Sequence, residues 1–235
     1  MLRAILQGQI HSVWDFLLLL AGYLLLLGIT MPLHEAAHAF TAYKLGDPTA
    51  KRMGRLTLNP LAHYDPIGST MILLLGIGYA KPVPVDPRYF RNQKWGMALT
   101  ALAGPLSNLL MAFACLALFK GIVALGGGIT ASGGYIYYSK EYVYYAYMAL
   151  VAVLARVNIA LAVFNLLPIP PLDGSRIFGA LLPVKWTVWM DRYHEIVRMA
   201  VLVLIVTGAL TGPMSYLTET VGNGMCRILG LPGIV

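Results

Sequence analysis

The chain has 235 residues, of which 58% are hydrophobic and only 11% are charged, and its net charge is +7. Together with a mean hydropathy of +0.70, this balance excludes an ordinary soluble globular protein and indicates a membrane protein. The Lys and Arg residues are spread through the loops between apolar runs, so their counter-charge is expected to be anionic lipid of the bilayer and not nucleic acid.

Four long apolar segments follow one another along the chain. Each is close to the roughly 17–25 residues that cross a bilayer as a helix. They cover residues 15–43, 96–119, 142–167 and 195–212. We therefore expect an α-helical polytopic membrane protein with about four transmembrane helices. The first segment is longer than a hydrocarbon core of about 30 Å requires, which leaves room for a tilt or for a kink at Pro32.

The first segment contains His34, Glu35 and His38, although ionisable side chains are costly in a membrane span and usually face a partner, a cavity or an ion. Residues four apart share one face of a helix. Both histidines can therefore direct a ring nitrogen at one metal ion while Glu35 lies beside it. This H-E-x-x-H pattern is typical of zinc hydrolases. The alternative, two histidines satisfied by neighbouring helices, is disfavoured by the apolar surroundings.

Residues 44–94 are predicted to form an insertion that contains strands. Residues 55–58 have the pattern of a short strand, and the alternating Pro and Val of 81–85 favour an extended edge. The apolar run 67–79 is too short to span and contains three glycines, so we expect a re-entrant or interfacial element there. We predict a small membrane-associated β-sheet, within a single domain covering residues 1–235.

After the third apolar segment comes Asn165-Leu166-Leu167-Pro168-Ile169-Pro170-Pro171-Leu172-Asp173-Gly174. Three prolines interrupt the helix here, and Gly174 permits a turn. A catalytic zinc held by two histidines needs a third protein ligand, and Asp173 is the best candidate. Irregular backbone at membrane depth is tolerated only where protein or a water-filled cavity covers it.

The distribution of basic residues predicts the orientation in the membrane. Eight Lys and Arg residues lie in 44–94 and four lie between Arg176 and Arg198, whereas four flank the spans on the opposite side. This excess places both loops in the cytoplasm. The H-E-x-x-H motif and Asp173 then lie at the same, cytoplasmic end of their spans, where they can meet. We expect the membrane to be a prokaryotic plasma membrane.

Three motifs, in this order, resemble the signatures of the site-2 protease family. They are the H-E-x-x-H motif at 34–38, Ala103-Gly104-Pro105-Leu106-Ser107-Asn108, and the stretch from Asn165 to Gly174. The resemblance, to the compact microbial type, implies an intramembrane zinc metalloprotease that cleaves transmembrane or membrane-anchored proteins near the bilayer surface. It also implies one Zn²⁺ per chain held by His34, His38 and Asp173, with Glu35 as the catalytic carboxylate.

The chemistry of these residues is consistent with peptide hydrolysis. Glu35 can act as a general base that takes a proton from a zinc-activated water and returns it to the leaving amine. Asn165 or Asn108 could stabilise the oxyanion or hold the substrate backbone. Hydrogen bonding between helices is an equally good interpretation of both, and Asn158 fits either role.

Two other functions stay open. A membrane metal-ion transporter or channel would explain the polar residues in the apolar segments, but not the position of Glu35 between two histidines. A homologue that binds membrane peptides without cleaving them would share every motif. The sequence does not indicate the substrate, the oligomeric state, or a role for His63 and Arg156 beyond an ordinary loop position and snorkelling.

Overall fold

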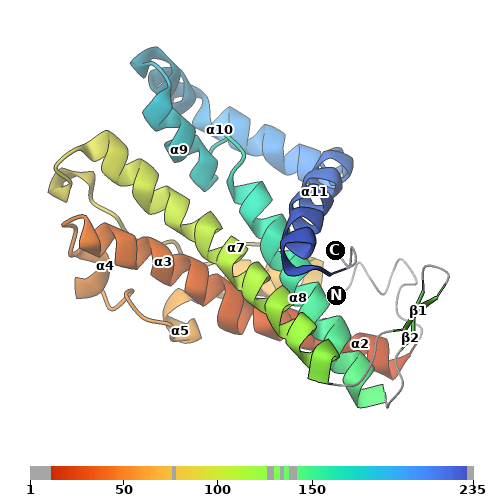
Figure 1. Cartoon of the computed structure of the whole chain (residues 1–235). Coiled ribbons are helices and arrows are strands. Elements are labelled where there is room, and N and C mark those ends of the chain that lie inside the picture. Colours follow the sequence, from red (N-terminus) through yellow and green to blue (C-terminus); the bar gives the residue numbers. More distant parts are fainter. Residues whose placement is uncertain (1–11, 76–77, 126–129, 133–134, 138–141, 232–235) are drawn as a thin grey trace.

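The computed structural model describes residues 12–75, 78–125, 130–132, 135–137 and 142–231, and most of these are helical (Figure 1). In chain order the helices are α2 Val13–Leu25, the π-helical turn η1 Leu26–Thr30, α3 Met31–Lys44, α4 Thr49–Arg52, α5 Pro60–His63, α6 Pro66–Leu75, the 3-10 turn η2 Pro87–Tyr89, α7 Gln93–Leu125, α8 Tyr142–Asn165, α9 Asp173–Leu181, α10 Val184–Val206 and α11 Thr211–Leu229. Two three-residue strands, β1 Thr130–Ser132 and β2 Tyr135–Tyr137, pair antiparallel between α7 and α8.

The helices α2 and α3 form one continuous helical run through η1. A capping box starts it: the Ser12 side chain accepts from the Asp15 N–H, and the Asp15 carboxylate accepts from the Ser12 N–H. Near the middle, Pro32 has no N–H to offer the carbonyl of Gly28 four residues earlier, and the π-helical turn lies directly at this interruption. The run is one of two helices in the described residues that are long and apolar enough to cross a membrane, the other being Gln93–Ala124.

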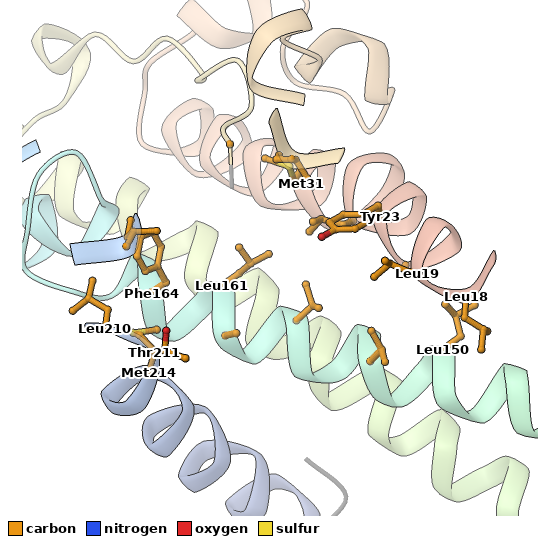
Figure 2. A pocket seen from close by; sticks show the side chains of 18 of the residues that line it. Leu18, Leu19, Tyr23, Met31, Leu150, Leu161, Phe164, Leu210, Thr211 and Met214 are labelled. Carbon is orange, nitrogen blue, oxygen red and sulfur yellow. The ribbon is translucent and has the colours of Figure 1, made fainter. Parts of the chain in front are cut away.

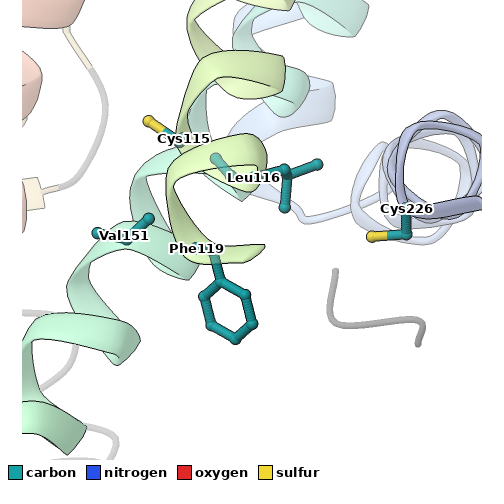
Figure 3. Packing of buried hydrophobic residues seen from close by; sticks show 6 residues of the cluster. Cys115, Leu116, Phe119, Val151 and Cys226 are labelled. Atoms are coloured by element: carbon teal, nitrogen blue, oxygen red, sulfur yellow. The ribbon is translucent and has the colours of Figure 1, made fainter. Parts of the chain in front are cut away.

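The central helix is α7, which packs along α3, α8 and α9 (Figure 1). Buried alanines on the facing helices, Ala112 of α7 and Ala155 and Ala162 of α8, allow the backbones to approach closely. Farther along α7, Leu116 and Phe119 pack with Val151 of α8 and Cys226 of α11 (Figure 3). This apolar cluster joins three helices.

The outer faces of the long helices carry large apolar side chains. Leu24, Leu110, Ile196 and Ile228, from four different helices, are each more than 50% exposed. Apolar surface over several helices is unusual for a protein in water and is what a lipid environment requires.

The predicted β-sheet in the insertion is wrong, because residues 55–58 and 81–85 form no strands. The Arg55 guanidinium donates to the Lys81 carbonyl instead, and the Lys81 N–H donates to the His63 carbonyl at 3.0 Å. The His63 ring bonds the Thr57 carbonyl at 2.8 Å through Nε2. The Arg55 and His63 side chains and the His63 carbonyl thus satisfy backbone groups that a strand ladder would have used.

The apolar run at 67–79 is helical over most of its length as α6, with residues 76–77 outside the described residues. The fourth predicted span, 195–212, is not a single helix. Helix α10 ends at Val206, a turn follows in which Gly208 has φ of 77°, and α11 begins at Thr211. Glycine adopts this left-handed conformation without steric cost, so the turn can divide the apolar run. Four transmembrane helices therefore remain a prediction.

Candidate metal centre

Three side chains predicted as metal ligands lie together in the structure. His34 and His38 are one turn apart on α3, and their Nε2 atoms are 3.0 Å from each other. Asp173, the first residue of α9, places Oδ2 3.3 Å from His34 Nε2 and 3.4 Å from His38 Nε2. The three atoms therefore converge on one point from two helices that are far apart in the sequence.

The spacing of these atoms fits zinc. Zinc binds nitrogen and oxygen ligands at about 2.0–2.2 Å, which in a tetrahedron separates the ligand atoms by about 3.3–3.6 Å. The three separations here lie between 3.0 and 3.4 Å, close to that range. Two imidazoles and one carboxylate are also a donor set typical of catalytic zinc, and they leave a fourth position for water or substrate.

The other ring nitrogen of each histidine is held by an acceptor. His34 Nδ1 lies 2.5 Å from Asn108 Oδ1 on α7, and His38 Nδ1 lies 2.7 Å from the backbone carbonyl of Thr100 on the same helix. A carbonyl oxygen can only accept, so each Nδ1 carries the proton and each Nε2 presents a lone pair. This tautomer and its outer partners are what metal-ligating histidines require.

The close approach of α7 depends on Gly104. A Cβ at this position would lie 2.6 Å from His34 Cε1 and would also overlap the His38 ring. Gly174 has a similar role beside Asp173, because a Cβ there would overlap the carbonyl groups of Leu166 and Leu167. A glycine in each of two motifs is thus explained by contacts around the site.

Asp173 is ionised in this setting. It opens α9 directly after the proline-rich break, and the first turn of a helix favours a negative charge. Burial raises the pKa of its carboxyl, but the proximity of the His34 and His38 rings outweighs burial and holds the pKa below its usual range. A metal-ligating carboxylate must be in this form.

Glu35 lies on α3 beside the ligands and is held by a neighbouring loop. Its Oε2 accepts a hydrogen bond from the Val83 N–H at 3.1 Å. Three residues later, the Asp86 N–H donates to Oδ2 of the fully buried Asp47 at 2.8 Å. The stretch 81–86 is therefore held by two hydrogen bonds, one to Glu35 and one to Asp47.

Two ionisable residues without a predicted role have structural contacts. His63 is 2% exposed; its ring binds the Thr57 carbonyl, and its own carbonyl accepts from the Lys81 N–H at the start of the loop that contacts Glu35. Arg156 of α8 lies 3.9 Å from Glu219 of α11, with both side chains about half-exposed. Neither is part of the group formed by the two histidines and Asp173.

Asn108 and Asn165, the two asparagines predicted to contact substrate, have different surroundings. Asn108 is buried with its oxygen on His34 and its Nδ2 donating to Asn158 at 3.0 Å. Asn165 is the last residue of α8, directly before the proline-rich break. The sequence did not predict the contact between His38 and the Thr100 carbonyl, because any residue can supply a backbone carbonyl.

A cavity of about 790 Å³ lies between α2, α8 and the turn joining α10 to α11 (Figure 2). Its lining is mainly apolar and includes Leu19, Leu161 and Phe164. Met31 also lines it, three residues before His34 on α3. The cavity therefore reaches the helix that carries both histidines.

The sequence profile of Peptidase family M50 matches residues 22–208, which include all three motifs. The chain belongs to peptidase family M50. This is the site-2 protease family, so the predicted membership is confirmed.

Two relatives of this M50 peptidase are named as zinc metalloproteases. It is 39% identical over 179 residues to "Putative zinc metalloprotease YwhC" of Bacillus subtilis (strain 168), covering 76% of this chain and 77% of that protein. It is 34% identical over 177 residues to "Putative zinc metalloprotease Rip2" of Mycolicibacterium smegmatis, covering 72% of this chain and 57% of Rip2. No solved structure gives a significant match. The M50 peptidase is accordingly a zinc metalloprotease, with zinc as its cofactor.

Proposed function

We propose that this chain is an intramembrane endopeptidase that hydrolyses peptide bonds of transmembrane or membrane-anchored proteins. The observation that carries the proposal is the position of the metal-binding group. His34 and His38 lie within the helical run Val13–Lys44, which is long and apolar enough to cross a bilayer. A hydrolytic centre in such a helix is within reach of substrates in the membrane.

In this proposal His34, His38 and Asp173 hold the zinc ion. When bound, zinc would activate a water molecule and polarise the substrate carbonyl. The 2.5 Å and 2.7 Å contacts of the two Nδ1 atoms keep the rings oriented toward the ion. The ionised Asp173 supplies the third ligand atom.

Glu35 is the general base and acid. Its carboxylate accepts the proton of the attacking water and donates it to the leaving amine as the C–N bond breaks. Because the Val83 N–H binds Oε2, we assign the proton transfer to Oε1. The Val83 contact limits rotation of the side chain and so keeps the carboxylate beside the ligands.

Asn165 is the side chain to which we assign the oxyanion or the substrate backbone. It is the last residue of α8, and the proline-rich break that follows leads directly to Asp173 at the start of α9. A neutral amide donor at this break is suited to a developing negative charge on the substrate oxygen. Asn108 is occupied on both sides by His34 and Asn158, so we assign it to the support of His34.

The apolar cavity is the place where we expect the substrate segment to lie (Figure 2). Its walls come from α2 and α8, and Met31 connects it to the helix of the histidines. Burial of apolar substrate side chains there would position the scissile bond, since a held substrate reacts more easily than a diffusing one.

The test of this proposal is cleavage of a panel of single-span membrane proteins by the purified, zinc-loaded chain in liposomes. We expect fragments that stop forming when zinc is chelated and form again when zinc is restored. The control is the same panel incubated with chelator from the start. Fragments that persist without zinc would contradict the proposal, as would a chain that binds no zinc.

We further propose that residues 1–235 form one membrane-embedded domain with 44–94 as a cytoplasmic insertion, in a prokaryotic plasma membrane. The four crossings would be the α2–α3 run, α7, α8 and a last one divided between α10 and α11. The excess of basic residues in two loops supports this orientation. Topology reporters fused at Lys51 and Lys185 should be cytoplasmic and a C-terminal reporter should not. A reporter at Lys185 found outside the cytoplasm would contradict the orientation.

A further inference from the structure

A row of buried polar side chains extends from the metal centre into the helix packing. Asn108 of α7, Asn158 of α8 and Thr30 of η1 are each at most 1% exposed. Asn108 Nδ2 donates to Asn158 Oδ1 at 3.0 Å, and Asn158 Nδ2 donates to Thr30 Oγ1 at 3.2 Å. Asn158 Nδ2 also donates to the Leu154 carbonyl at 2.8 Å. Three helices therefore meet through hydrogen bonds directly behind His34.

The direction of every bond in this row follows from its far end. The Leu154 carbonyl can only accept, so Asn158 must turn its Nδ2 toward it and its Oδ1 toward Asn108. Asn108 must then present Nδ2 to Asn158 and Oδ1 to His34. His34 Nδ1 must in turn donate, because an amide oxygen offers no proton.

The two histidines thus reach the same tautomer by different means. His38 Nδ1 faces a backbone carbonyl directly, whose orientation cannot change. His34 Nδ1 faces a side-chain amide, which would offer a donor instead of an acceptor if it were turned over. Only the contact with Asn158 distinguishes the two orientations of Asn108 in the described structure.

We propose that Asn158 is a positioning residue that fixes the amide orientation of Asn108 and so keeps Nε2 of His34 available to the metal. The inference rests on the proposed function in one respect, that His34 is a zinc ligand. Asn158 lies behind Asn108, two hydrogen bonds from the His34 ring. Its effect is therefore on the affinity of the site and not on the chemical step.

The test is the zinc affinity of purified variants, measured by competition with a chelator in detergent. Asn158→Leu removes the acceptor of Asn108 and keeps the number and branching of the side-chain heavy atoms. We expect it to weaken zinc binding by about 10–100-fold, the usual cost of losing an outer-shell partner. Thr30→Val is the matched control, because the Leu154 carbonyl still orients Asn158, and its zinc affinity should stay within about twofold.

A second background separates positioning from simple helix packing. In Asn108→Asp the carboxylate can accept from His34 Nδ1 in any orientation, so Asn158 has nothing left to orient. Adding Asn158→Leu to Asn108→Asp should then change the zinc affinity by no more than about twofold. The bond between positions 108 and 158 is already absent in Asn108→Asp, whereas the bond from Asn158 to Thr30 remains. If Asn158 acted only by joining α8 to η1 through Thr30, the loss would be as large in this background as in the native one.

Three results would overturn the inference. They are a zinc affinity of Asn158→Leu equal to that of the native chain, an equal loss in the Asn108→Asp background, and an equal loss in Thr30→Val. If Asn158→Leu does not fold, Asn158→Asp decides, since it still accepts from Asn108: retained zinc affinity supports the inference and a tenfold loss overturns it. Failure of the proposed function is distinct, because the native chain itself would then bind no zinc or cut no membrane protein.

Discussion

Replacing Glu35 with Gln is expected to reduce cleavage of membrane-protein substrates by about 10²–10⁴-fold, the contribution typical of general acid–base catalysis. The amide cannot take the proton of the attacking water. Gln has the same shape and can still accept the hydrogen bond from the Val83 N–H, so the loop beside the site should stay in place. Zinc content should remain that of the native chain, because Glu35 is not among the three grouped ligands.

The measurement is the rate of fragment formation from single-span substrates in liposomes, with zinc content determined on the same preparations. Glu195→Gln is a matched control, since Glu195 is an exposed carboxylate that pairs with His194 and Arg198 away from the metal centre. Native cleavage rates in Glu35→Gln would show that another group moves the proton. Transport of zinc across the liposome membrane by the same variant would favour a metal transporter instead.

Replacing Asp173 with Ala is expected to weaken zinc binding by more than the roughly 100-fold that an outer-shell change can cost, and to abolish cleavage with it. The variant removes an oxygen that lies 3.3 Å and 3.4 Å from the two histidine nitrogens. Two imidazoles alone leave zinc without the third protein ligand of a catalytic site. The helices should still pack, because Asp173 lies at the start of α9 and outside the apolar clusters.

Chelator competition gives the zinc affinity, and helix content by circular dichroism shows whether the chain is folded. Asp86→Ala is the matched control: it deletes a carboxylate that binds Arg88 on the loop and does not contact the histidines. Native zinc affinity in a folded Asp173→Ala variant would exclude Asp173 as a ligand. The third ligand would then have to be a residue other than those of the group His34, His38 and Asp173.

Local patterns explain how much of the site was predictable. Helical periodicity places His34 and His38 on one face whatever surrounds them, so their shared direction follows from a spacing of four. The prolines after Asn165 end α8 for equally local reasons, since proline lacks the N–H and clashes with the preceding turn. Membership of the family and the use of zinc as cofactor, both predicted from three motifs in the family's order, are confirmed.

The structure differs from the sequence-based expectation where local preference competes with distant partners. Residues 55–58 have the composition of a strand, yet the buried Arg55 and His63 bind the backbone of this region and of Lys81, and no ladder forms. The apolar run 195–212 has the length of a span, yet a turn at Gly208 divides it between α10 and α11. Composition alone does not show which hydrogen-bond partner a backbone group will find.

The sequence by itself determined the class of protein, the shared helix face of the two histidines, the place of Glu35 between them and the break before Asp173, because these depend on composition, helical spacing and proline stereochemistry. Only the tertiary structure decided that Asp173 meets the histidines, that Asn108 supports His34 and that Asn158 binds Asn108. Those contacts join helices separated by many residues, and hydrogen bonds between them depend on how closely α7 packs at Gly104. Packing distance and bond direction belong to the assembled helices and not to any one segment.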